Sequence, residues 1–145
     1  MPKITPFLWF EGKAEEAARF YVSVFGHGKI ASTNPMMTSF ELEGQAFIGL
    51  NGGPKYKFTE AVSFFISCQT QAEVDHFWDR LSEGGETHVC GWLKDRYGLS
   101  WQVVPDALGR LMGDPDRARS QRVMQAMLSM TKIVIADLET AHAGG

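Results

Sequence analysis

The chain contains one internal repeat, and this repeat limits the possible fold more than any other feature. When residues 14–28 are aligned with residues 71–85, similar residues fall opposite each other. The aligned pairs are Ala17 with Val74, Phe20 with Phe77, Tyr21 with Trp78, Val24 with Leu81, and Gly28 with Gly85. Because a single repeat cannot bury both its helix and its strands, the two repeats are expected to share one core.

The first repeat has the pattern of a strand, a helix and a hairpin. Ile4–Phe10 is a predicted strand, and Gly12–Phe25 is a predicted helix because its apolar residues recur at helical spacing. Ser39–Leu42 and Ala46–Leu50 are predicted strands joined by a Glu-Gly turn. These elements together form about one half of the repeated region.

The second repeat has the same pattern. Val62–Cys68 is a predicted strand, and Gln71–Ser82 is a predicted helix with one apolar face. Thr87–Leu93 and Leu99–Val104 are predicted strands, and the polar segment Lys94–Gly98 between them is expected to form a charged turn. Trp9, Trp78 and Trp101 are expected to fill the core between sheet and helices.

These elements predict an α+β protein of two βαβββ repeats that form a cupped mixed β-sheet with the helices on its outer face. Repeat one is expected at about residues 1–57 and repeat two at about residues 58–105. Residues 1–105 would then form one domain, which suits the length of the chain. Residues 106–145 are expected to form a helical tail that packs on the domain or in a dimer.

The tail has a recognisable helix start and an apolar stripe. Asp114 is a predicted N-cap with Pro115 in the first helical position, and Thr131 is a predicted cap of a last short helix. The apolar stripe comprises Val123, Met124, Met127 and Leu128. The tail also contains four methionines, which are expected to pack in the core or in a dimer contact. The alternative is that they line a flexible ligand surface: Met112, Met124, Met127 and Met130. Arg117, Arg119 and Arg122 are expected on a solvated face.

The net charge and the hydropathy of the chain indicate which kinds of molecule it could bind. The net charge is −3 and the pI is about 5.8, so the chain has no basic field to attract nucleic acid. No apolar run is long enough to span a membrane, and the N-terminal sequence lacks the arrangement of a signal peptide. We therefore expect a cytoplasmic protein with a small-molecule ligand, with no nucleic acid and no membrane as partner.

The two cysteines give no indication of a metal site or a disulfide framework. Cys68 and Cys90 lie in different predicted strands and form no CxxC pair. Both are expected to be inert and partly buried. A nucleophile made of Cys90 and His88 is disfavoured, because no third group that would orient the histidine is evident.

Several motifs, in the right order, resemble one known family. The motifs are ITPFLWFEGKAEEAARFYVSVFG, LNGGP, SFFISCQTQAEVDHFWDRLSEGG and CGWLKDRYGLSWQVVP. Together they resemble the PhnB-like branch of the glyoxalase, bleomycin-resistance and dioxygenase superfamily, also called the vicinal oxygen chelate superfamily. Some members of this branch carry the name 3-demethylubiquinone methyltransferase. Relatives usually have a longer loop where this chain has the short segment Ser32–Met36, which implies a differently shaped pocket border.

The resemblance also implies where a metal site would lie. Superfamily enzymes hold a divalent metal with His, Glu or Gln side chains from both repeats. The corresponding positions here are Pro6, Gly49, Ser63 and Gln102. Proline and glycine offer no side-chain donor, and a neutral serine hydroxyl is a weak ligand. We therefore expect no metal and no cofactor. Asn51–Pro54 is not a nucleotide-binding loop either, so the sequence does not support an S-adenosylmethionine methyltransferase.

The remaining prediction is a cup lined by alternate strand residues. The expected inward residues are Leu8, Phe10, Phe47, Asn51, Ser63, Phe65, Ser67, Ser100, Gln102 and Val104. Asn51, Ser63, Ser67 and Gln102 are the predicted hydrogen-bonding contacts of a ligand, and Trp92 is the predicted aromatic contact. The alternative for the four polar residues is that they satisfy neighbouring backbone groups or water.

The sequence is compatible with three functions. The favoured one is a metal-independent small-molecule-binding protein that forms a homodimer. The second is a metal-dependent lyase, isomerase or dioxygenase whose site uses Gln102 with Glu41 or a residue of a partner chain. The third is a protein-interaction module that binds through the methionine-rich tail.

Overall fold

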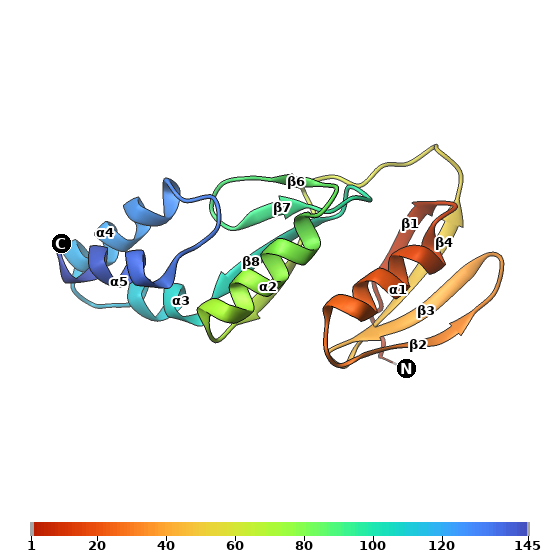
Figure 1. Ribbon diagram of the computed structural model, residues 1–145, viewed down its shortest axis with the longest axis horizontal. Helices are drawn as coiled ribbons and strands as arrows, with labels where there is room; N and C mark the ends of the chain where they lie inside the picture. The colour runs from red at the N-terminus through yellow and green to blue at the C-terminus, as the bar shows by residue number, and fades with distance from the viewer. Residues whose placement is uncertain (1, 145) are drawn as a thin grey trace. The chain divides into compact units, whose positions relative to one another are not determined.

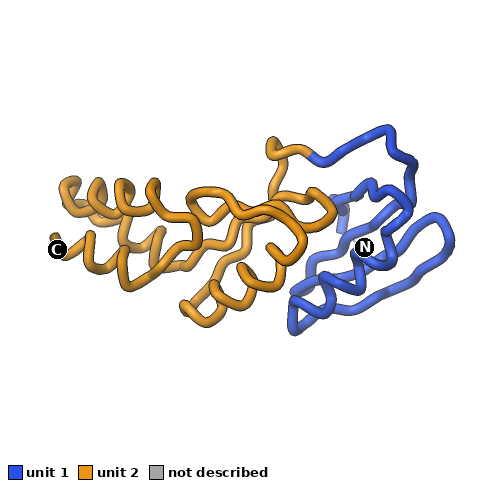
Figure 2. The backbone as a smooth tube through the Cα atoms, turned by 45° about the horizontal axis from the view of Figure 1, so that its top comes forward, with its two compact units in different colours: residues 1–58 blue, residues 59–145 orange. Residues whose placement is uncertain are grey.

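The computed structural model describes residues 2–144 and consists of two compact units, Met1–Phe58 and Thr59–Gly145 (Figure 2). Each unit contains one βαβββ repeat and one four-stranded mixed sheet. The predicted α+β class with a duplicated βαβββ unit is confirmed. Among the described residues, no helix has the length and apolar character needed to cross a membrane.

The first unit consists of a sheet with one helix on one face. Its elements are β1 (Phe7–Glu11), α1 (Ala14–Val24), β2 (Gly28–Thr33), β3 (Met37–Leu42) and β4 (Gln45–Gly52) (Figure 1). The strand order is β1-β4-β3-β2, with β1 and β4 parallel and the other pairs antiparallel. The core lies between α1 and the sheet, where Tyr21 contacts Phe10 and Phe40.

The second unit repeats this topology and adds three helices. Its repeat consists of β5 (Phe64–Cys68), α2 (Gln71–Ser82), β6 (Glu86–Thr87), β7 (Trp92–Lys94) and β8 (Ser100–Pro105). The strand order is β5-β8-β7-β6, with β5 and β8 parallel. The apolar face of α2 buries Val74, Trp78 and Leu81, the partners of Ala17, Tyr21 and Val24 in the sequence repeat.

Two features of the first unit were not predicted from the sequence. The strand β2 was not located from the sequence, because Ile30 is its only large apolar residue and only two of its six residues are partly buried. The short segment before β3 is a tight hairpin turn. Its Asn34 side chain accepts hydrogen bonds from the backbone N–H groups of Met36 and Met37, at 2.8 and 2.9 Å. Asparagine is well suited to such a turn because its side chain imitates a backbone acceptor.

The predicted strand Thr87–Leu93 is wrong, because the chain leaves the sheet between β6 and β7. Cys90 and Gly91 both have positive φ angles, 60° and 80°. Their N–H groups donate to the carbonyls of Met130 and Thr131 in the tail, at 2.8 and 2.9 Å. This backbone pairing with a distant segment replaces the ladder bonds that a continuous strand would make.

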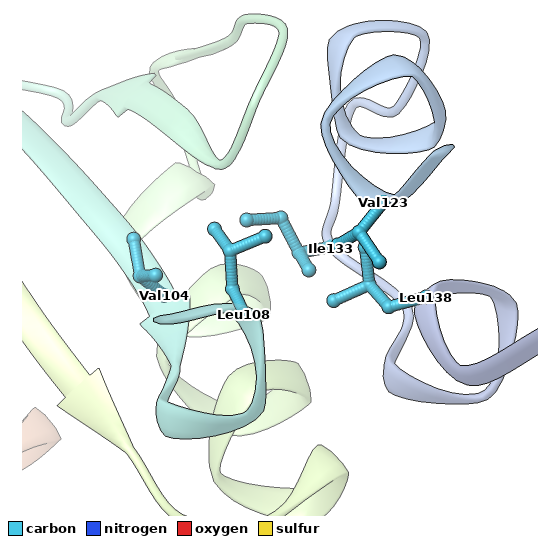
Figure 3. Close-up of a cluster of buried hydrophobic side chains, with 5 residues drawn as sticks. All are labelled: Val104, Leu108, Val123, Ile133 and Leu138. Carbon is cyan, nitrogen blue, oxygen red and sulfur yellow. The ribbon is translucent and has the colours of Figure 1, made fainter. Parts of the chain in front are cut away.

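The tail is an integral part of the second unit. It forms α3 (Asp106–Met112), α4 (Arg117–Leu128) and α5 (Ile135–Ala143). Figure 3 shows its core, in which five buried side chains from β8 and the tail meet: Val104, Leu108, Val123, Ile133 and Leu138. Leu111, Met112, Met127 and Met130 pack against this cluster.

Several predictions for the tail are wrong in detail. Asp116, not Asp114, caps α4, because its carboxylate accepts from the N–H groups of Ala118 and Arg119. The Asp114 carboxylate instead accepts a hydrogen bond from the Asp116 N–H and forms a hydrogen bond with the His142 side chain. Backbone and His142 hydrogen bonds hold the pKa of Asp114 below its usual value. Arg122 is half-buried and donates to the last carbonyls of α5, at Ala141 and His142.

The start of α5 is held by α2 and not by the predicted cap Thr131. The Gln71 side-chain oxygen accepts from the Ile135 N–H at 2.8 Å, and its amide donates to the Ile133 carbonyl at 3.1 Å. The cap comes from a residue more than 60 positions away. Local sequence therefore gave no signal for it.

Replacing Gln71 with alanine should lower the free energy of unfolding by about 1–2 kcal/mol, because α5 loses its cap and Ile133 loses a donor. The measurement is urea unfolding followed by circular dichroism. Gln121→Ala is the matched control, because Gln121 is exposed on α4 and should change stability by less than about 0.5 kcal/mol. Equal effects of the two variants would contradict the proposed role of Gln71.

Candidate ligand-binding site

The sheet of the second unit has one face beneath α2 and one open face. On β5, Ile66 and Cys68 are buried on the helix side, whereas Phe65 and Ser67 are exposed on the other. Phe65 and Trp92 both pair with Gln102, which therefore lies between two aromatic residues on adjacent strands. This arrangement defines the open face as a candidate site.

A hollow of about 580 Å³ lies on this open face. Its sheet side is formed by Phe65, Trp92, Gln102 and Val104, with Cys90 beside them. The rest of its lining belongs to the end of β8 and the tail: Pro105, Asp106, Leu108, Gly109, Met112 and Met127. A smaller hollow of about 310 Å³ shares Cys90 and Trp92 and is bordered by the buried Ser100, whose hydroxyl has no hydrogen-bonding partner among the described residues.

Three of the five predicted ligand contacts lie together at this site. The Gln102 side-chain amide donates to the Ser63 hydroxyl at 3.0 Å, and Gln102 and Trp92 both line the hollow. Gln102 is half-buried, and its amide oxygen makes no hydrogen bond within residues 2–144. Ser67 shares the open face and is exposed, but it does not line the hollow. The amide of Gln102 is thus the central polar group.

Asn51 belongs to the first unit and is occupied by local structure. Its side-chain oxygen accepts from the Ala14 N–H at the start of α1, at 2.7 Å, and its amide donates to the Pro35 carbonyl at 3.0 Å. Asn51 borders a separate hollow of about 450 Å³, together with Lys13 and Glu15. The structure thus gives Asn51 the role of a helix cap, the alternative considered for the polar residues.

The expected inward residues of the first repeat lie on the wrong face of the sheet. Leu8, Phe10 and Phe47 are buried in the helix-side core, and a side chain at Gly49 would meet Ala14 of α1. The open face instead carries the half-buried Trp9, predicted to be a core residue, whose indole N–H donates to the Gly53 carbonyl. The error arose because a strand shifted by one residue presents its other face. The strands β1 and β5 have the same spacing to the helices that follow them, but their buried positions are out of phase by one residue: Leu8 and Phe10 are buried, whereas Phe65 and Ser67 are exposed.

The positions implied for a metal hold few donors. The carbonyl of Pro6 accepts from the Ile48 N–H, Gly49 faces α1, and the Ser63 hydroxyl is paired with Gln102. Glu41, the additional candidate, forms an ion pair with Lys29 at 3.2 Å. Within residues 2–144 no group of three or more His, Cys, Asp or Glu side chains is arranged to hold a metal ion.

Tail residues that line the hollow were only partly foreseen. Met112 and Met127 were candidates for a ligand surface among four methionines, and the structure separates them from Met124, which is exposed, and Met130, which packs against the tail core. Asp106 was not predicted to line a ligand site. Its position at the hollow depends on how the chain turns after β8, which the local sequence does not indicate.

The two thiols have different surroundings. Cys68 is fully buried rather than partly buried as expected, and burial raises the pKa of its thiol to about 12, so the thiol stays protonated at neutral pH. Cys90 is half-buried and borders both hollows. The neighbouring His88 side chain lies 3.2 Å from the Glu86 carboxylate.

Thiol labelling should therefore distinguish the two cysteines. With Ellman's reagent at pH 8, Cys90 is expected to react in the folded protein and Cys68 only after unfolding. Cys90→Ser should remove the reaction of the folded protein and keep the reaction after unfolding. Two thiols that react equally fast without denaturant would contradict the buried position of Cys68.

Comparison with known proteins identifies the family. The model of the family described as 3-demethylubiquinone-9 3-methyltransferase matches residues 2–104. A PhnB protein from Bacillus cereus is 34% identical with a TM-score of 0.67, and the match covers 72% of this chain and 99% of that one. No curated protein matches the chain.

More distant structures share the fold alone. A protein from Pseudomonas aeruginosa is 22% identical with a TM-score of 0.60, over 72% of this chain and 98% of that one. A fosfomycin resistance protein from Listeria monocytogenes, complexed with Mn(II) and sulfate, is 14% identical with a TM-score of 0.53, over 70% of this chain and 88% of that one. The chain therefore belongs to the PhnB-like 3-demethylubiquinone-9 3-methyltransferase family and has the fold of the glyoxalase and bleomycin-resistance proteins of the vicinal oxygen chelate superfamily.

Proposed function

We propose that this chain binds a small organic molecule on the open face of its second sheet and does so without a metal ion. The observation that supports this most is the hollow in which Phe65 and Trp92 flank the amide of Gln102. Its volume of about 580 Å³ lies within the range of small-molecule sites, roughly 300–1,000 Å³. Apolar walls with one central polar group suit a ligand held by packing and oriented by a hydrogen bond.

The lining favours an aromatic ligand that is neutral or positively charged. Phe65 and Trp92 offer ring surfaces for stacking or edge contacts. Among the described residues that line the hollow, Asp106 is the only charged one, and none is a Lys or Arg that would neutralise an anion. A carboxylate or phosphate ligand would therefore lose hydration without gaining a charge partner.

The donor chemistry supports binding without a metal. Of the four implied positions, only Gln102 carries a good oxygen donor, and its amide is bonded to Ser63. A divalent ion held by protein side chains needs about three or more ligands. The residues present at these positions therefore do not fit a bound divalent metal. Methyl transfer, as in the family's description, gains no support from this lining, which offers no residue set for a methyl-donor cofactor.

The test is a titration of protein treated with EDTA, followed by fluorescence, against aromatic probes of different charge. The probes are cationic ethidium, neutral Nile red and anionic 8-anilinonaphthalene-1-sulfonate. We expect the neutral or the cationic probe to bind more tightly than the anionic one, with no change when Mg²⁺ or Mn²⁺ is added. Gln102→Ala and Trp92→Ala should each weaken binding roughly threefold or more, since a lost hydrogen bond or ring contact is worth about 1 kcal/mol.

Gln45→Ala is the matched control, because Gln45 is exposed in the first unit and should leave binding unchanged. Binding that requires a divalent metal would contradict the proposal and favour the metal-dependent alternative. Three silent probes, or equal effects of Gln45 and Gln102 substitution, would also overturn it.

A further inference from the structure

We propose that the C-terminal helices form one wall of this hollow and that Met112 and Met127 contact the ligand and select for flat aromatic molecules. This inference rests on the proposed function, because it concerns the same site. It goes beyond that function because it places the specificity of the site in a segment outside the family match. Two methionines of the tail would then help the rings of the shared sheet to set what this chain binds.

The tail lies outside the part of the chain that relatives share. The family model ends at residue 104, and α3 begins at Asp106. Nearly the whole Bacillus cereus protein aligns with 72% of this chain, so the remaining residues have no counterpart there. The sheet side of the hollow comes from the shared part, whereas Leu108, Met112 and Met127 come from the added part.

The added wall is packed against the sheet and hydrogen-bonded to the loop beside it. Leu108 lies in the buried cluster with Val104 of β8, and the fully buried Ile133 belongs to the same cluster (Figure 3). Backbone hydrogen bonds from Cys90 and Gly91 to tail carbonyls fix the loop between β6 and β7 to the tail. The wall is therefore built into the fold of the second unit and does not depend on a flexible segment.

Met112 and Met127 lie at the boundary between this core and the hollow. Each packs against the buried cluster, and each also lines the hollow. Methionine has an unbranched, polarisable side chain that adapts to different shapes and makes favourable contacts with aromatic rings. Phe65 and Trp92 supply ring surfaces from the sheet, so a flat aromatic ligand would contact rings and thioethers in the same hollow.

The direct test is NMR of protein labelled with ¹³C-methyl methionine and titrated with ethidium or Nile red. Signals are assigned by single Met→Leu substitutions. We expect the methyl signals of Met112 and Met127 to shift on binding and that of Met124 to stay in place. Met124 is the internal control, because it lies on the same helix α4 as Met127 but is exposed and does not line the hollow.

Substitution gives an independent readout. Met127→Ala, combined with Met112→Ala, should weaken binding roughly threefold to tenfold, whereas Met124→Ala should leave it unchanged. If Met127 contacts the probe by packing alone, Met127→Leu should bind the probe better than Met127→Ala does. If the sulfur atom makes the contact, the two variants should bind the probe equally poorly. Both results support contact between Met127 and the ligand. Circular dichroism verifies that the variants remain folded.

The outcomes distinguish this inference from the proposed function. If Gln102→Ala weakens binding but no methionine signal shifts, the site is correct and the tail wall is wrong. If neither Gln102 nor the methionines respond, both proposals fail. If probe binding falls as protein concentration rises, while sedimentation shows the expected homodimer forming, a second copy occupies the hollow and the inference is overturned.

Discussion

Asp95→Ala is expected to lower the free energy of unfolding by about 3–5 kcal/mol. Asp95 was predicted to lie in a charged turn, but it is only 2% exposed. Its carboxylate accepts from the N–H groups of Tyr97 and Leu99, at 2.8 and 3.1 Å, and from the Trp101 indole at 2.9 Å. Alanine would leave these donors without a partner, two of them in buried surroundings.

The measurement is chemical unfolding followed by tryptophan fluorescence, to which Trp101 contributes as one of four tryptophans. Asp79→Ala is the matched control: it also removes one carboxylate, but Asp79 is exposed on α2, and the change should stay within about 0.5 kcal/mol. Asp95→Asn should fall between the two, because the amide keeps one acceptor oxygen. A loss below about 1 kcal/mol for Asp95→Ala would show that this hydrogen-bond cluster does not hold the turn.

Leu138→Ala should cost about 3 kcal/mol, because it opens a cavity in the tail core. Leu138 is fully buried beside Val123 and Ile133, as Figure 3 shows. Leu128 is the same residue type on α4 with 52% of its surface exposed, so Leu128→Ala should cost less than about 1 kcal/mol. Thermal or urea unfolding measures both.

This pair also bears on the third function considered, in which the tail is a free interaction module. A tail that folds independently of the sheet would lose its structure in Leu138→Ala while the rest of the unit stayed unchanged. We expect one cooperative transition for the second unit instead, because Val104 of β8 and Leu108 of α3 share the cluster with Leu138. Two separate transitions would contradict the integral role of the tail.

The repeat and the helices could be predicted from sequence because their signals are local. Helical spacing in residues 71–82 located α2 at its observed bounds. The faces of the strands could not be predicted in the first unit, because equivalent positions of β1 and β5 are buried in opposite phase: Leu8 is buried, whereas Phe65 is exposed. The break at Cys90 was invisible for another reason: its cause is a hydrogen bond to Met130, which is far away in the sequence.

The candidate site likewise has parts that local sequence patterns predicted and parts that depend on tertiary packing. Alternation along β5 and β8 predicted that Phe65 and Gln102 share one face, and both line the hollow together with Trp92. Asn51 was misplaced because nothing in the sequence shows that its amide caps α1. The tail wall depends on where α3 turns after β8, which is a property of tertiary packing and not of local pattern.

The central claim is that a small molecule binds on the open face of the second sheet without a metal. The most direct measurement is ¹⁵N NMR of the side-chain signals in EDTA-treated protein during titration with the probe that binds best. We expect the Gln102 amide and the Trp92 indole signals to shift, while the Asn51 amide and Trp9 indole signals of the first unit stay in place. Shifts confined to Asn51 and Trp9, or shifts that occur only after Mg²⁺ is added, would contradict it.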